Sequence, residues 1–468
     1  MKRIVFIIIT VAAIGCPSFA ANGFEHEVAQ LKAAMQRDSA NARTFADGLL
    51  KKDKKNPDLA AALGTTFLRA NRIEDAEYFY DKGYHMYRIS TTVINLAGDI
   101  ALAKNDRKQA EYYYGRAIYF NKRDPEGYFK FANLYTKTDP DKAIQKLKVL
   151  KNYRHEMDID LKMAQVYYDS NKFSDAAQLY ASLPADSLGK EELTSYALSY
   201  YFQQKFDSAL IVTKQGIRRF PRHPAFNRML LYNNTELKRY DDALTAANKL
   251  FHHSDKAEFQ YLDYIYYGYA LNGRGHYDQA IAQFNKVLEL NGNRKDVLKT
   301  ISDAYENIGD YDRAVDYYRQ YVAKMDGDER STFDDFHIGS LYYAKGTDEK
   351  KTKELTPEKV EALRQADAQF AIVEQQRPDS YLGAYWRART NVALDPDTQK
   401  GLAKPHYLKV IDIITSKGET SSQLMESYKY LAYYYYLKHD KDSCLIYVDK
   451  IMEIDPMDSY ALQISNAL

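Results

Sequence analysis

Small residues recur along this chain at intervals of about 34 residues, and this period constrains the fold more than any other feature of the sequence. The series consists of Ala42, Ala76, Ala110, Ala143, Ala176, Ala209, Ala243, Ala280, Ala314, Ala366, Ala403 and Cys444. Up to Ala243 the spacing is almost constant, and all the longer gaps fall after it. A period of this length indicates tandem structural units that bury a core by stacking on their neighbours.

Two further columns accompany the series. A small residue such as Gly98 or Gly268 lies twelve residues upstream of a series member, and an aromatic residue such as Tyr114 or Phe284 lies four residues downstream. Positions three or four apart share one face of a helix. The pattern predicts two helices per unit that cross closely at the small residues, with an aromatic ring filling the gap beside each crossing.

The start of the second helix in each unit has its own signal. An aromatic residue followed by Ser or Asp recurs there, as in Phe173-Ser174 and Tyr240-Asp241. Ser and Asp side chains accept hydrogen bonds from the free N–H groups of a first helical turn. We therefore expect Ser174 and Asp241 to be N-caps.

The Leu63-Gly64 pair with Phe67, Ala76 and Tyr80 resembles the tetratricopeptide repeat, in which W-x2-L-G-x2-Y is followed by A-x3-F. The resemblance covers residues 23–456. It implies an all-α, right-handed superhelical solenoid of about twelve helix-turn-helix repeats, with a charged insertion at 345–356 and a capping helix within 457–468.

The unit that contains Ala403 departs from this rhythm at Gly401-Leu402-Ala403-Lys404-Pro405. Gly401 and Pro405 predict a kink or a break in its second helix. The stretch is similar to those in exported, multi-repeat envelope proteins of Bacteroidota.

Residues 1–20 have the pattern of a secretory signal peptide. Lys2 and Arg3 precede the apolar run Ile4–Ile14, and Ser18-Phe19-Ala20 supplies the small residues that a signal peptidase requires. The pattern predicts cleavage between Ala20 and Ala21. The run is shorter than the roughly 20 residues of a membrane-spanning helix, and no second run of that length follows.

An alternative lies in the same segment, because Ala13-Ile14-Gly15-Cys16 is similar to a bacterial lipobox. Processing there would leave a lipid anchor at Cys16. Both alternatives predict export to the periplasm or the periplasm-facing envelope of a Gram-negative bacterium, one without a lipid anchor and the other as a lipoprotein.

Composition and motifs exclude several classes of function. Lys plus Arg number 65 and Asp plus Glu number 64, so the basic surplus of a nucleic-acid-binding protein is absent. The sequence contains no phosphate-binding loop and no nucleophile elbow. Its ten His residues are scattered, and Cys444 occupies a column of small packed residues. We expect no catalytic residue, no metal ligand set and no cofactor.

The remaining candidate is a binding groove along the first helices of the repeats. In this family, ligands are contacted by the groove-facing stripe of each first helix. By register, the candidate groove residues are Asn133, Gln165, Tyr168, Tyr201, Arg228, Tyr232, Tyr269, Asp303, Tyr343 and Tyr433. Tyr offers a large, rigid contact surface and a hydroxyl group, which suits recognition of a peptide or a protein.

The sequence therefore predicts a protein–protein interaction scaffold in the cell envelope that binds an extended peptide or a partner protein in its groove. The alternative is a protein that binds glycan or peptidoglycan. Exposed Trp would favour that alternative, but the only Trp, Trp386, lies beside the small residue Ala388, where core packing is expected. A third hypothesis is an enzyme with active residues in the groove, for example Lys299 and Asp303, but their i, i+4 spacing is typical of a surface ion pair.

Overall fold

The computed structural model describes residues 23–53, 56–86, 88–327, 329–350 and 352–468. The predicted signal peptide, its cleavage residues Ala20 and Ala21 and the alternative lipidation site Cys16 lie outside these residues. The chain divides into two compact units, Met1–Ala257 and Glu258–Leu468.

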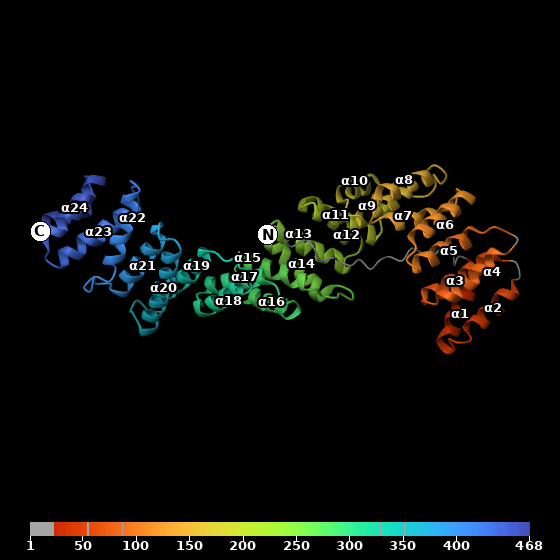
Figure 1. Ribbon diagram of the computed structural model, residues 1–468, viewed down its shortest axis with the longest axis horizontal. Coiled ribbons are helices and arrows are strands. Elements are labelled where there is room, and N and C mark those ends of the chain that lie inside the picture. The colour runs from red at the N-terminus through yellow and green to blue at the C-terminus, as the bar shows by residue number, and fades with distance from the viewer. Residues whose placement is uncertain (1–22, 54–55, 87, 328, 351) are drawn as a thin grey trace. The chain divides into compact units, whose positions relative to one another are not determined.

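The described residues are helical throughout and contain no strand, which confirms the predicted all-α class (Figure 1). The first unit contains α1 (Glu25–Arg37), α2 (Ala42–Lys52), α3 (Pro57–Arg69), α4 (Ile73–Tyr84), α5 (Thr91–Ala103), α6 (Arg107–Phe120), α7 (Pro125–Tyr135), α8 (Pro140–Lys151), α9 (Ile159–Asp169), α10 (Phe173–Ser182), the short 3-10 helix η2 (Ala185–Ser187), α11 (Lys190–Phe202), α12 (Phe206–Arg219), α13 (Pro224–Glu236) and α14 (Tyr240–His253). The second unit contains α15 (Tyr261–Gly273), α16 (Tyr277–Leu290), α17 (Lys295–Ile308), α18 (Tyr311–Ala323), α19 (Thr332–Thr347), α20 (Pro357–Gln376), α21 (Tyr381–Leu394), α22 (Lys404–Ser416), α23 (Ser422–Leu437), α24 (Lys441–Ile454) and α25 (Ser459–Ala467).

The helices pair in sequence order, with odd-numbered first helices and even-numbered second helices, and α25 packs against α23 and α24. The residues Lys345–Thr347, which the sequence assigns to the insertion, are the last turn of α19. None of the described helices is both long and apolar enough to span a membrane.

The turn between the two helices of a pair is closed by one residue in the left-handed conformation. It stands two positions before the second helix in eight pairs, at Asn71, Asn105, Asn171, Gln204, Lys238, Gly275, Gly309 and His439. The next backbone N–H donates to a carbonyl five residues earlier, as from Lys172 to Tyr167 (2.9 Å). These are Schellman turns, which satisfy the free carbonyl groups at the end of the first helix.

The predicted N-caps were wrong for this reason. Since the turn ends at the residue after the left-handed one, the second helix begins at the aromatic residue itself. Lys172 precedes α10 and Arg239 precedes α14, and neither side chain caps its helix. Ser174 and Asp241 lie inside the first turn, where Asp241 still interacts favourably with the positive end of the helix dipole.

Glycines in the first helices lie directly against aromatic rings of the second helices, as the columns predict. A Cβ atom built on Gly98 would lie 2.3 Å from the Tyr114 ring, and one built on Gly268 would lie 2.5 Å from the Phe284 ring. The pair α3 and α4 differs, because Phe79 rather than the predicted Tyr80 is fully buried there and stacks on Phe67 at 5.5 Å.

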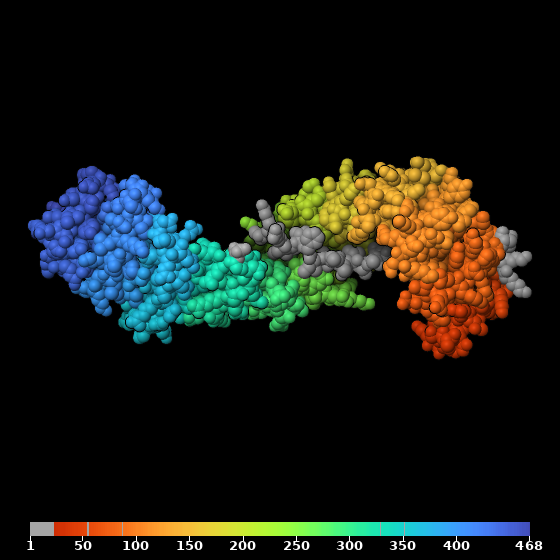
Figure 2. Space-filling model, viewed as in Figure 1, coloured from red at the N-terminus to blue at the C-terminus, as the bar shows by residue number. Residues whose placement is uncertain are grey.

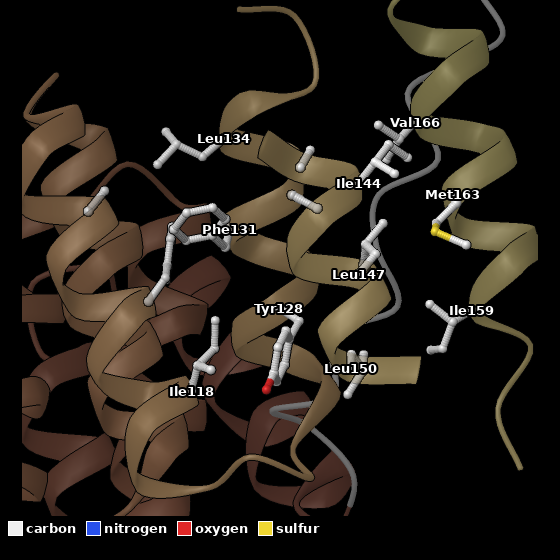
Figure 3. Packing of buried hydrophobic residues seen from close by; sticks show 14 of the residues in the cluster. Ile118, Tyr128, Phe131, Leu134, Ile144, Leu147, Leu150, Ile159, Met163 and Val166 are labelled. Carbon is white, nitrogen blue, oxygen red and sulfur yellow. The ribbon is translucent and has the colours of Figure 1, made fainter. Parts of the chain in front are cut away.

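Neighbouring pairs share a continuous core. In Figure 3 the side chains of α7 and α8 meet, and those of α9 face them from the next repeat. The labelled residues of these three helices are Tyr128, Phe131, Leu134, Ile144, Leu147, Leu150, Ile159, Met163 and Val166. Within each unit the space-filling view shows side chains occupying the space between successive pairs (Figure 2). Burial of apolar surface between repeats thus holds each array together.

The pair α21 and α22 corrects the prediction of an interrupted helix. Pro405 lies in the first turn of α22, where its missing N–H costs nothing, and Gly401 precedes the helix with φ +66°. The buried carboxylate of Asp395 accepts hydrogen bonds from the backbone N–H groups of Lys400 (2.9 Å) and Gly401 (2.8 Å). Gly401 and Pro405 therefore form a capped loop before a regular helix.

Candidate functional site

First helices of successive repeats contact one another directly. In the first unit α3 contacts α5, α5 contacts α7, α9 contacts α11 and α11 contacts α13. Among the described helices, successive second helices make no comparable contact. The first helices therefore lie on the inner side of each stack, where a groove is expected.

All ten candidate groove residues lie on first helices, but they are divided between the units. Asn133, Gln165, Tyr168, Tyr201, Arg228 and Tyr232 belong to Met1–Ala257, and Tyr269, Asp303, Tyr343 and Tyr433 belong to Glu258–Leu468.

The tyrosines of the first unit are supported by phenylalanine rings. The Tyr168 ring lies 5.9 Å from that of Phe173, and the Tyr201 ring lies 5.5 Å from that of Phe206. Both tyrosines are partly buried, and burial raises the pKa of Tyr168, so its hydroxyl remains a donor at neutral pH. Tyr232 lies against Tyr201 and is only 2% exposed. Tyr168 and Tyr201 therefore offer contact surface that Tyr232 lacks.

The polar candidates of this unit differ in their availability. Asn133 is exposed, whereas Arg228 is only 7% exposed. Gln165 donates to Asp169 (2.9 Å) and accepts from the Tyr180 hydroxyl (3.1 Å). Gln165 thus has a structural role in joining α9 to α10.

A charged cluster between α5 and α7 occupies the same face. Asp99 accepts hydrogen bonds from the Tyr114 hydroxyl (2.7 Å) and from Lys130 (2.6 Å), and Lys130 lies 3.6 Å from Glu126. Burial raises the pKa of Glu126 to about 7, against the attraction of Lys130. Neighbouring Asn95 is fully buried, and its side chain favours the charged form of Glu126 without overcoming the effect of burial.

Replacing Glu126 with Gln is expected to remove a pH dependence of stability. The carboxyl group binds its proton more tightly in the folded chain than in the unfolded chain, where its pKa is about 4.5. Its contribution to stability is therefore fully present below pH 4.5 and is lost as pH rises through 7. Between pH 5 and 8 the free energy of unfolding of the wild type should fall by about 2–3 kcal/mol, whereas that of Glu126→Gln should not show this fall. Urea denaturation at both pH values measures the difference, with Glu419→Gln on an exposed loop as the control. Equal pH profiles for all three proteins would contradict the expectation.

In the second unit the candidate Tyr343 belongs to an aromatic cluster. Its ring lies 5.2 Å from that of Trp386, which also contacts Phe336 (5.8 Å) and Phe370 (5.6 Å). The only Trp is thus partly buried and packs against these rings, in line with the core packing that the sequence predicts. Tyr433 is 39% exposed, and Tyr269 packs against Phe284 at 5.5 Å.

Asp303 is the remaining candidate. Burial raises its pKa, and Lys299 forms no salt bridge with it among the described residues. The fold brings Glu306 and His337 next to Asp303, a grouping that sequence analysis missed. Their spacing could have indicated it, because Asp303 and His337 are one repeat period apart and therefore occupy equivalent positions on successive first helices.

An open hollow of about 420 Å³ lies on a different face, over α6, α7 and α8. Its lining includes Tyr112, Arg116, Tyr119 and Lys142. Tyr112 is 55% exposed and Tyr119 is 75% exposed. These two tyrosines project from a second helix and are therefore outside the predicted groove.

Comparison with known families decides the class of the repeat. Residues 268–329, from within α15 to beyond α18, match the family model of the tetratricopeptide repeat. Residues 268–329 therefore contain tetratricopeptide repeats. This repeat generally mediates protein–protein interaction, and proteins built on it are typically scaffolds without catalytic activity. No curated protein matches the sequence.

Solved structures of other repeat proteins are similar to this chain. The C-terminal part of a TPR repeat-containing protein from Cytophaga hutchinsonii is 24% identical, with 65% of this chain and 98% of that chain covered and a TM-score of 0.40. A tetratricopeptide repeat protein from Parabacteroides merdae is 14% identical, with 55% and 98% covered and a TM-score of 0.36. A chain of the APC/C hetero-tetramer Cut9–Hcn1 is 14% identical, with 92% and 86% covered and a TM-score of 0.31.

Proposed function

We propose that the protein is a non-catalytic scaffold of the cell envelope that binds an extended peptide or a partner protein along its first helices. The observation that carries this proposal is the placement of Tyr168 and Tyr201. They are one repeat period apart, lie on the adjacent first helices α9 and α11, and present partly exposed rings that Phe173 and Phe206 support.

The spacing of such rings suits an extended ligand. Packed helices lie about 8–10 Å apart, and an extended chain advances about 3.3 Å per residue. Side chains two or three residues apart in a bound peptide could therefore reach Tyr168 and Tyr201 in turn. Tyr loses little conformational entropy on binding, which makes two pre-supported rings efficient anchors.

The envelope location rests on the sequence of residues 1–20. An apolar run after Lys2 and Arg3, followed by small residues up to Ala20, supports export, and Cys16 supports a lipid anchor as the alternative. Partners in this proposal are therefore exported proteins or envelope proteins that face the periplasm.

The test is an affinity capture from native envelope extract with mass spectrometry of the bound proteins. The bait is the wild-type chain, a Tyr168→Ala/Tyr201→Ala variant, or a Tyr112→Ala/Tyr119→Ala variant that removes two tyrosines from the other face. Tyr232 is left in place, because truncating a buried ring would disturb the core. Circular dichroism confirms equal helicity of the three baits.

We expect one envelope protein to be captured by the wild type and by the Tyr112/Tyr119 variant but not by the Tyr168/Tyr201 variant. If both rings are anchors, their loss should weaken binding by about 2 kcal/mol each, or roughly thirtyfold per ring. Retention of the partner by the Tyr168/Tyr201 variant would refute the groove assignment. Capture of no protein by the wild type would refute the scaffold function.

A further inference from the structure

Three potential metal ligands converge on the first-helix face of the second unit. Asp303 and Glu306 lie one turn apart on α17, and His337 lies on α19, the first helix of the next repeat. One carboxylate oxygen from each acid and one ring nitrogen of His337 all lie within 4.8 Å of one another.

None of the three groups is committed to another polar partner. In the described part of the chain, neither carboxylate forms a salt bridge or a side-chain hydrogen bond, and neither ring nitrogen of His337 is hydrogen-bonded. The Nε2 atom of His337 is also buried. A buried polar atom without a partner costs about 1–3 kcal/mol, so its retention calls for a compensating role.

The imidazole is held in place by aromatic rings. Its centroid lies 4.3 Å from the Tyr318 ring, and Phe333 stacks on it at 6.3 Å with an interplanar angle of 16°. The Tyr318 hydroxyl donates to Asp334 (3.0 Å), which fixes that ring in turn. The ring of His337 is thus positioned before any ligand arrives.

The charge of the group also suits a cation. Asp303 and Glu306 place two carboxylates one helical turn apart, and neither forms a salt bridge among the described residues. A divalent cation would offset both carboxylate charges.

We propose that Asp303, Glu306 and His337 bind a divalent transition-metal ion, with Zn²⁺ as the best fit, between α17 and α19. One imidazole nitrogen and two carboxylate oxygens are ordinary Zn²⁺ ligands at about 2.0–2.2 Å. Mg²⁺ and Ca²⁺ fit less well, because they favour six or more oxygen ligands.

Ligand atoms around a tetrahedral Zn²⁺ lie about 3.4 Å apart, since each bond is about 2.1 Å long. The three side chains must therefore close by up to about 1.4 Å, a movement within the reach of rotations in Asp and Glu. The fourth coordination position would remain for water or for a group of a bound partner. The ion would cross-link two successive repeats.

The test titrates the full chain, after treatment with a chelator, with Zn²⁺ by calorimetry and with Co²⁺ by visible absorption. The variant His337→Phe keeps a ring between Tyr318 and Phe333 and removes both nitrogens. The matched control is His223→Phe, because His223 Nδ1 is likewise buried without a hydrogen-bond partner but belongs to no such ligand group.

We expect one Zn²⁺ per chain for the wild type and for His223→Phe. Loss of an outer-shell partner typically weakens a metal site by about 10- to 100-fold, so loss of the His337 ligand should weaken it by more than about a hundredfold. The isosteric variants Asp303→Asn and Glu306→Gln should each weaken binding too, and they decide the matter if His337→Phe does not fold. No ion bound to the wild type, or equal binding by all ligand variants, would overturn the proposal. Neither outcome bears on the partner capture at Tyr168 and Tyr201.

Discussion

Replacing Arg387 with Ala is expected to destabilise the second unit by about 3–5 kcal/mol. The guanidinium of Arg387 on α21 binds both oxygens of Asp367 (3.0 and 3.1 Å) and one oxygen of Glu374 (3.0 Å), both on α20. All three side chains are largely buried. Loss of the guanidinium leaves Glu374 with Lys409 (2.5 Å). It leaves Asp367, among the described residues, with only the neutral amide of Asn391 (2.9 Å). The poorly compensated Asp367 carboxylate then costs more than the bridge itself contributes.

The neighbouring Arg389 provides a matched control for this prediction. It lies on the same helix, is more exposed, and reaches Glu426 only at 3.8 Å. Arg389→Ala should therefore cost less than about 1 kcal/mol, as exposed ion pairs do. Arg387→Lys should recover only part of the loss, because an ammonium group cannot form the paired bonds to Asp367. Chemical denaturation monitored by circular dichroism ranks the variants, and similar losses for Arg387→Ala and Arg389→Ala would contradict the argument.

The contacts inside a repeat could be predicted from sequence because they recur at fixed spacing. Gly98 and Tyr114 are sixteen residues apart, and so are Gly268 and Phe284. Where two aromatic residues are adjacent, as Phe79 and Tyr80 are, the spacing does not determine which of them fills the gap beside the helix crossing. Phe79 is the one buried, because its ring can stack on Phe67 and has no hydroxyl group to satisfy.

The starts of α10 and α14 were predicted two residues too late, because the sequence pattern indicates Ser174 and Asp241 as N-caps. Asn171 and Gly309 occupy left-handed positions that favour Asn and Gly, so the turn has a readable signal in those repeats. Gln204 and Lys238 occupy the same position, although neither residue type favours the left-handed conformation. There the tertiary packing of the two helices imposes the turn, and local sequence does not reveal it.

The candidate site was predictable only by register. Sequence places Tyr168, Tyr201 and Tyr232 on first helices but cannot show that Tyr232 is buried against Tyr201. Burial depends on how consecutive first helices pack. His337 was missed for a related reason, because its two carboxylate neighbours come from the preceding repeat.

Replacing Gly98 with Ala is expected to destabilise the first unit by about 3 kcal/mol, the upper end of the usual cost of overpacking. The new methyl carbon would lie 2.3, 2.6 and 2.9 Å from three atoms of the Tyr114 ring. That ring cannot move aside easily, because it is buried and its hydroxyl donates to Asp99 (2.7 Å). The gain in helix propensity of about 1 kcal/mol does not offset the clash.

The same substitution at Gly115 should have the opposite sign. Gly115 lies within α6 of the same repeat, and a Cβ atom there would meet nothing within 4 Å. Gly115→Ala should therefore stabilise the unit by about 1 kcal/mol, which is the difference in helix propensity alone. Thermal or urea denaturation of the two variants separates helix propensity from packing. A double variant, Gly98→Ala with Tyr114→Leu, should cost less than the sum of its single changes, because the smaller side chain gives the methyl group room. Additive losses would show that the close approach of α5 and α6 does not depend on this pair.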